Sequence, residues 1–281
     1  MNMGISPLTY TPWSGTRMGR LKNVLRIVFE EAKIRVTVWS LIIILITYLL
    51  VYINAFYQAV RPAPIEKYGY VSTIGNLYLY MMLLSAYLAF NIISRDLKNG
   101  SIILYLSRPI TRIEYIVSKF LAVCFHLSLI TIVPLLLVYI IDIASLPQSS
   151  KFITEASKLL LPLIGSALLM VILFGSVTIM LSSLTKDGKW ASAGVFGVFL
   201  IGGFIAEIVG SALNNNYAYL FYLWNSVIIV VINMFGMRIS PRSPPWYHLP
   251  WYYGLSIIIG AIVLSFSVVY WRFLRREGIV A

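Results

Sequence analysis

The stretch from Val36 to Tyr57 reads VTVWSLIIILITYLLVYINAFY and contains no charged side chain. A helix needs about 20 consecutive apolar residues to cross the hydrocarbon core of a bilayer, so this stretch is predicted to span a membrane. The whole chain of 281 residues is 59% hydrophobic and only 11% charged. A single soluble core cannot bury that much apolar surface, and the sequence therefore predicts an all-α integral membrane fold.

Four more segments meet the same criterion, and a sixth segment has Trp251 and Trp271 at its ends, where interfacial anchors are found. The predicted transmembrane helices are 36–57, 74–93, 117–141, 159–181, 190–213 and 251–271. Residues 1–16 are expected to form a flexible N-terminus, and residues 17–281 a single transmembrane domain.

The segment 217–235 is apolar but contains Asn225 and Asn233 and precedes a proline-rich stretch, SPRSPPWYHLP. Six spans with both termini in the cytoplasm place 16 of the 22 Lys and Arg residues inside, as the positive-inside rule requires. A seventh span would put the basic tail WRFLRREG outside. We therefore expect 217–235 to form an outer re-entrant or interfacial hairpin before the last span, with a seventh span as the alternative.

An amphipathic helix is predicted ahead of the first span, from Arg17 to Arg35. Its apolar residues recur at helical spacing, and most of its charged residues lie elsewhere on the helix. The apolar set is Met18, Leu21, Leu25, Val28 and Ala32. Such a helix lies in the membrane interface, although a solvated helix without membrane contact is the alternative.

The loop between the second and third spans, 94–119, reads SRDLKNGSIILYLSRPITRIEYIVSK. Gly100 permits a helix end, and Pro109 ends a short apolar helix at about 102–107. Thr111 and Glu114 have the spacing of a capping box for the next helix, and Lys119 is expected at the headgroup level. A short apolar helix that projects from the membrane has to be covered by a partner.

At these residues the chain resembles the membrane subunits of type-2 ATP-binding-cassette (ABC-2) exporters. The family pattern is an acid, three residues, Gly-Ser/Thr, an apolar stretch ending in Leu, a Pro-hydrophobic-Ser/Thr-Arg turn, and a Lys. This chain supplies Asp96, Gly100, Ser101, Leu104, Leu106, Pro109, Ile110, Thr111, Arg112 and Lys119. Asp96 stands where Glu is more usual, which shortens the reach of the acid.

The resemblance implies that 17–281 is a permease domain and that the 94–119 loop carries a cytoplasmic coupling helix, which docks on a separate ABC ATPase (nucleotide-binding) subunit. Apolar Leu104 and Leu106 would supply buried area, and Arg108 and Arg112 would pair with acids on the partner, unless these arginines only fix topology. The docking residues are expected to be Asp96, Gly100, Ser101, Leu104, Tyr105, Leu106, Arg108, Pro109 and Arg112.

Cofactors and partners follow from the same resemblance. The chain lacks a G-x-x-x-x-G-K-[ST] phosphate loop, so ATP and Mg would be bound by the partner ATPase and no cofactor by this chain. A second permease copy or paralogue would complete a dimer in the cell (plasma) membrane. The excess of 22 basic over 10 acidic residues lies between the spans, which indicates membrane topology rather than nucleic-acid binding. A single cysteine and two histidines make a metal site unlikely.

One acid, Glu207, lies within a predicted span, near its outer end. Gly203 and Gly210 share its face, and small residues allow close helix packing. Glu207 is interpreted either as a group that reaches the outer headgroups or as one that lines the pathway or a subunit contact. Pro134 in the third span is expected to kink it, which would serve either a gate or packing.

Two alternative classes of function are a secondary transporter or channel and a membrane-embedded enzyme. A secondary transporter or channel predicts several charges within the spans, but only Glu207 is present. A membrane-embedded enzyme acting on lipid predicts clustered Asp, Glu or His at a membrane boundary, and these residues are sparse. We expect no catalytic residues in this chain, and its apolar spans do not specify the substrate.

Overall fold

The described part of the chain folds into helices and contains no strand. The computed structural model describes residues 24–25, 27–33, 37–60, 67–100, 111–145, 150–241 and 243–275. In chain order the elements are α2 (Val38–Val60), α3 (Lys67–Asn91), α4 (Ser94–Asn99), α6 (Arg112–Ser145), α7 (Ser150–Leu184), α8 (Gly188–Phe196), the π-helix η1 (Gly197–Ile201), α9 (Gly202–Ala212), the 3₁₀ helix η2 (Asn216–Phe221), α10 (Leu223–Met234), the 3₁₀ helix η3 (Pro245–His248), α11 (Trp251–Tyr270) and the π-helix η4 (Trp271–Arg275). The predicted all-α membrane fold is confirmed.

Within the ranges that the structure describes, five helical segments are long and apolar enough to cross a membrane. They are Lys67–Asn99, Arg112–Ala144, Ala156–Leu184, Gly188–Ala212 and Trp251–Phe273. A sixth candidate combines the N-terminal helix Ile27–Lys33 with Val38–Ile53, two helices that are bent by 83°. Six spans were predicted, and the bend agrees with an interfacial helix that leads into the first of them.

Two helices extend well beyond the predicted spans 117–141 and 159–181. α6 has 34 residues and α7 has 35, so each is about 50 Å long at 1.5 Å per residue. The hydrocarbon core is only about 30 Å thick, and the helices therefore continue past it. Both also run through an internal proline, Pro134 in α6 and Pro162 in α7.

The segment 217–235 forms a compact hairpin instead of a span. α10 has 12 residues and is about 18 Å long, too short to cross the core. Its residues from Ser226 to Ile232 are all buried, because α10 packs against α11 and α7 while η2 packs against α9. Protein thus covers the hairpin, as a re-entrant segment requires.

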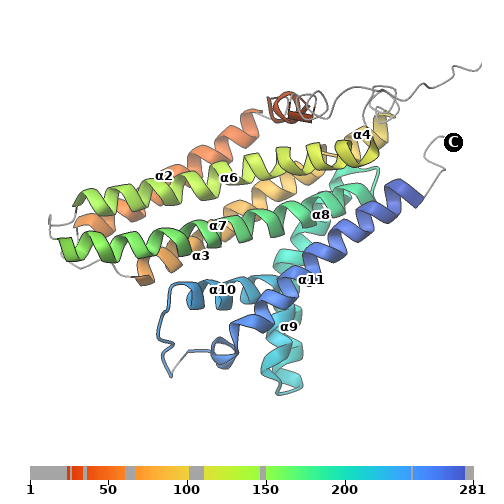
Figure 1. Cartoon of the computed structure of the whole chain (residues 1–281). Coiled ribbons are helices and arrows are strands. Elements are labelled where there is room, and N and C mark those ends of the chain that lie inside the picture. Colours follow the sequence, from red (N-terminus) through yellow and green to blue (C-terminus); the bar gives the residue numbers. More distant parts are fainter. Residues whose placement is uncertain are drawn as a thin grey trace, which may run out of the picture.

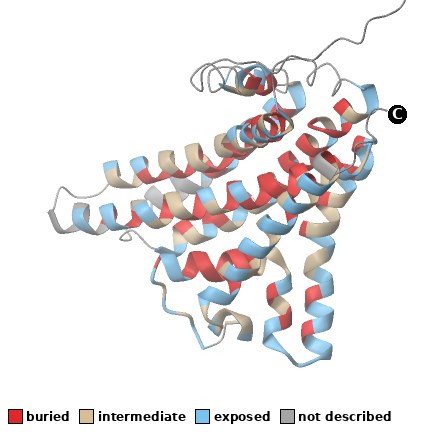
Figure 2. Cartoon of the chain, turned by 45° about the vertical axis from the view of Figure 1, so that its right-hand side comes forward, coloured by how far each residue is buried: buried red, intermediate tan, exposed pale blue. Residues whose placement is uncertain are grey.

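The core lies where α3, α6 and α7 pack together (Figure 1). Their inward side chains, such as Leu77, Leu127 and Phe174, are fully buried. α8 packs on α3, α11 packs on α7, and α2 packs on α6. Figure 2 shows buried residues through the centre of this bundle and exposed residues along its outer helices.

The fifth span is interrupted by the π-helix η1, which separates α8 from α9. The carbonyl of Phe199 in η1 accepts hydrogen bonds from the hydroxyl groups of Tyr78 on α3 and Tyr222 in the hairpin, between η2 and α10. These two hydroxyls also lie 2.7 Å apart, within hydrogen-bonding distance. The irregular turn is therefore held by groups from two other elements, and π-helical turns of this kind often occur at functional sites.

Candidate functional site

The structure describes the two flanks of the 94–119 loop, residues 94–100 and 111–119. α4 and Gly100 precede the loop centre, and Thr111 and α6 follow it. Asp96, Gly100 and Arg112 belong to these flanks. The predicted docking residues Ser101, Leu104, Tyr105, Leu106, Arg108 and Pro109 lie outside the described residues.

A serine from α7 holds the break between α3 and α4. The Ser182 hydroxyl accepts the backbone N–H groups of Ile93 and Ser94, at 3.0 and 3.1 Å, and donates to the carbonyl of Ala89 at 2.7 Å. These backbone groups lose their regular helical partners at the break, and buried polar groups need replacements. α7 therefore fixes the direction in which α4 leaves the membrane-length helix.

Both predicted turn signals of the loop are present. Gly100 has φ +66° at the end of α4, the left-handed conformation that glycine adopts without steric cost. Thr111 donates its N–H to Glu114 Oε2 at 2.8 Å, while the N–H of Glu114 donates to Thr111 Oγ1 at 3.2 Å. This reciprocal pair is the predicted capping box at the start of α6.

A buried charge cluster connects the two flanks. Lys119 on α6 is fully buried, and its Nζ lies 2.7 Å from Asp96 Oδ2 on α4 and 2.7 Å from Glu31 Oε1 on the N-terminal helix. The Tyr115 hydroxyl donates to Asp96 Oδ2 at 2.8 Å, and the Tyr115 ring centroid lies 5.3 Å from Lys119 Nζ. We call Lys119, Asp96, Glu31 and Tyr115 the Lys119 cluster.

The cluster shows that protein encloses the side chain of Lys119, and its expected place at the headgroup level stays a prediction. Its side chain is 0% exposed because two carboxylates meet it inside the protein, and a buried charge needs such compensation. Asp96 is also buried, at 8% exposure, so its carboxylate faces Lys119 and its role in docking stays a prediction. The shorter aspartate nevertheless reaches the lysine.

Sequence reasoning missed Glu31 as a member of this site. Ile27 and Glu31 are four residues apart, so they share one face of the N-terminal helix, and both are buried together with Ala32. The predicted apolar face of this helix, which includes Leu25, Val28 and Ala32, does not contain Glu31. Two sequence features could have indicated the buried ion pair. Glu31 shares a helix face with the apolar Ile27, and Lys119 lies inside the predicted span 117–141.

The C-terminal end of the last span also joins this region. Arg112 donates from Nη1 to the carbonyl of Phe273 in η4 at 2.9 Å, and the rings of Phe273 and Tyr115 lie 6.2 Å apart. Arg272 donates to the carbonyl of Leu184 at the end of α7. Arg112 therefore already binds a backbone carbonyl within the chain, and any contact with a partner stays a prediction.

Three of the four candidate pathway residues, Gly203, Glu207 and Gly210, lie on α9, at the other end of the bundle. A Cβ at Gly210 would lie 2.5 Å from the ring of Tyr219, and one at Gly203 would lie 3.1 Å from Tyr222. The glycines therefore let the hairpin tyrosines pack closely on α9. Glu207 between them is exposed, and Pro134 is buried within α6.

The described residues contain no group of three or more His, Cys, Asp or Glu side chains that could hold a metal ion. The Lys119 cluster has one cation, two anions and one hydroxyl. This arrangement suits a structural role, in which the ion pairs hold the N-terminal helix, α4 and α6 together.

A family model described as "ABC-2 family transporter protein" matches residues 25–278. The chain belongs to the ABC-2 transporter family. A search of curated protein sequences finds no match.

Family membership makes this chain a multi-pass membrane permease of the ABC transporter class. The matched region includes all the described helices, from the N-terminal helix to η4. In this ABC-2 permease, the acid and the lysine of the motif, Asp96 and Lys119, pair with each other across the loop. Gly203, Glu207 and Gly210 stay together on α9, far from that pair along the bundle (Figure 1).

Proposed function

We propose that this permease is an exporter driven by a separate ABC ATPase subunit that docks on the 94–119 loop. ATP and Mg are bound and ATP is hydrolysed in that partner, and the α4 end of the bundle faces the cytoplasm of the cell. The observation that carries the proposal is the Lys119 cluster. It joins both flanks of the loop to the N-terminal helix through ion pairs of 2.7 Å.

The cluster provides a route for movement. A partner that tilts the loop moves α4 and the start of α6 together, because Asp96 and Lys119 are paired between them. The N-terminal helix follows through Glu31. Packed elements of this kind move as rigid bodies between discrete arrangements, so the tilt reaches α2 and α3 and opens the pathway alternately to each side.

A second copy or a paralogue completes the pathway in this proposal. Only 22% of the most apolar window in Gly188–Ala212 and in Trp251–Phe273 is buried within the chain, against 50–61% in the other three spans. Glu207 lies on the exposed side of the first of these. A carboxylate at membrane depth is costly in lipid, and a water-filled pathway between two copies gives it a suitable environment.

The docking assignment is tested by replacing Leu104 and Leu106 with Asp. The full chain is purified from its native membranes in mild detergent, and the ATP hydrolysis and the phosphate-loop ATPase that co-purify are measured. We expect both to be lost in the double variant, because buried carboxylates destabilise an apolar contact. The variant should still elute as a folded permease.

The matched control is Leu213→Asp, an equally drastic change at an exposed leucine at the opposite end of the bundle, after α9. It should retain the ATPase. Co-purification that is unchanged in the loop variant, or lost equally in the control, contradicts docking on 94–119.

A further inference from the structure

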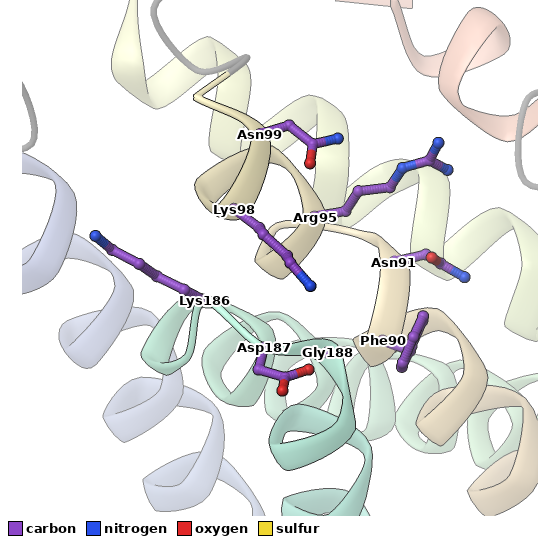
Figure 3. A pocket seen from close by; sticks show the side chains of 8 residues that line it. All are labelled: Phe90, Asn91, Arg95, Lys98, Asn99, Lys186, Asp187 and Gly188. Atoms are coloured by element: carbon purple, nitrogen blue, oxygen red, sulfur yellow. The ribbon is translucent and has the colours of Figure 1, made fainter.

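A pocket of about 480 Å³ opens between α4 and the connection from α7 to α8. This volume lies within the range of small-molecule sites, about 300–1,000 Å³. It is lined by Phe90, Arg95, Lys98, Lys186, Asp187 and Gly188, with the amides of Asn91 and Asn99 (Figure 3). At its base α8 approaches α3 so closely that a Cβ at Gly188 would lie 2.2 Å from the carbonyl oxygen of Phe90. The pocket is therefore built on a tight helix contact.

The charges that line the pocket are mainly positive. Figure 3 shows Lys98 pointing toward the α7–α8 connection, with Arg95 and Lys186 extending to either side. Within the part of the chain that the structure describes, none of these three cations forms an ion pair. The one acid, Asp187, caps α8 by accepting the backbone N–H of Lys189 at 3.1 Å. The lining thus carries three cations and one anion, and its net positive charge favours an anionic ligand.

The depth of the pocket indicates which anion it meets. The second predicted span ends at Ile93, and Arg95 and Lys98 lie on α4 just after the break in the helix, at most about 8 Å beyond that end at 1.5 Å per residue. The headgroup layer of each leaflet is about 5–8 Å thick. Trp190, two residues after Gly188, is 71% exposed, and exposed tryptophans mark the headgroup level.

We propose that this pocket binds a phosphate group, as carried by the headgroup of an anionic phospholipid. Basic pockets between membrane helices bind such headgroups. Lys98 contacts the phosphate, and the flexible side chains of Arg95 and Lys186 close on it from both sides. Phe90 is 42% exposed and gives an apolar surface to the first part of an acyl chain. An acidic segment of a protein partner is disfavoured by the depth of the pocket.

The test uses the full-length permease alone, so its result does not depend on an ATPase. The protein is placed in nanodiscs of equal parts phosphatidylglycerol and phosphatidylcholine, and native mass spectrometry counts the lipids that each chain retains. The wild-type protein should retain phosphatidylglycerol preferentially. Arg95→Gln, Lys98→Gln and Lys186→Gln should each reduce this preference by about fivefold, because each removes one charge at the membrane surface.

Lys189→Gln is the matched control. It removes the same charge from an exposed lysine beside the pocket that does not line it, and it should leave the preference unchanged. All three substituted pocket side chains are exposed, so the variants should fold normally.

A second arm separates the sources of phosphate. Stabilisation against heating is measured in detergent with added phosphatidylglycerol or with inorganic phosphate. If only the lipid stabilises the protein, and the pocket variants lose this effect, the ligand is a lipid headgroup. If inorganic phosphate stabilises the protein equally, and the same variants lose this effect, the pocket is a phosphate site whose ligand comes from solution. A preference that survives all three substitutions, or that Lys189→Gln removes equally, overturns the proposal.

Discussion

At the scale of single residues, the side chains of the Lys119 cluster compensate one another for the free-energy cost of burying charges. Two carboxylates and one ammonium group are buried together, with a tyrosine hydroxyl donating to one of the acids. Burial of any one of these charges without its partners is strongly unfavourable. The cluster should therefore be far more sensitive to losing one member than to being neutralised as a whole.

Lys119→Met tests this property. Removing the cation takes from the buried Asp96 and Glu31 the ion-pair partner that they share, and we expect a loss of about 3–5 kcal/mol of stability, measured as unfolding in detergent. Adding Asp96→Asn and Glu31→Gln to the same chain should restore most of that stability. Lys158→Met, at an exposed lysine on α7, is the control and should change stability by less than about 0.5 kcal/mol. A Lys119→Met protein as stable as the wild type would exclude the buried ion pairs.

At the scale of elements, apolar length and charge placement predicted most of the architecture. The hydropathy pattern predicted the six spans, and the basic residues after the last span indicated that 217–235 is not a seventh span. The predicted spans were shorter than α6 and α7, because hydropathy reports only the part of a helix that lies in the lipid core and not the full length of the helix. The π-helix η1 was not predicted, since its stabilising tyrosines come from distant elements.

The same reasoning separates what was predictable in the candidate site. Local signals, Gly100 and the Thr111–Glu114 pair, were interpreted correctly because they act within one turn. Glu31 and Ser182 were missed because their partners are brought together only by tertiary packing. A buried lysine cannot be inferred from its own neighbours in the sequence.

The tyrosine pair on η1 leads to a prediction about the hairpin. Tyr78→Phe together with Tyr222→Phe removes both hydroxyl donors to the carbonyl of Phe199. A buried carbonyl left without them costs about 1–3 kcal/mol, and α9 and the hairpin should loosen relative to α8. Amide hydrogen exchange should then become faster in 197–202 and in 216–234 and stay unchanged in α7. Tyr270→Phe, at an exposed tyrosine, is the control; exchange that is unchanged in the double variant would contradict a stabilising role.

At the scale of the whole molecule, several apolar surfaces are left exposed, among them one along α2 and one along α9. They differ in charge: α2 has no charged residue in Val38–Val60, whereas α9 carries Glu207. Lipid suits the first surface, and the carboxylate makes lipid unfavourable for the second. The proposed two-fold pairing of copies should therefore use the α9 surface.

Cross-linking distinguishes the two surfaces. The single cysteine, Cys124, is first replaced by Ser, and then one new cysteine is introduced, as Glu207→Cys on α9 or as Leu45→Cys on the exposed side of α2. A two-fold axis brings each residue near it close to its own copy, so a short bis-maleimide reagent should produce covalent dimers in membranes from Glu207→Cys and not from Leu45→Cys. Dimers from Leu45→Cys alone would place α2 at the interface between the copies. Glu207 would then face the lipid headgroups, because a carboxylate far from the partner copy can be hydrated only in the headgroup layer.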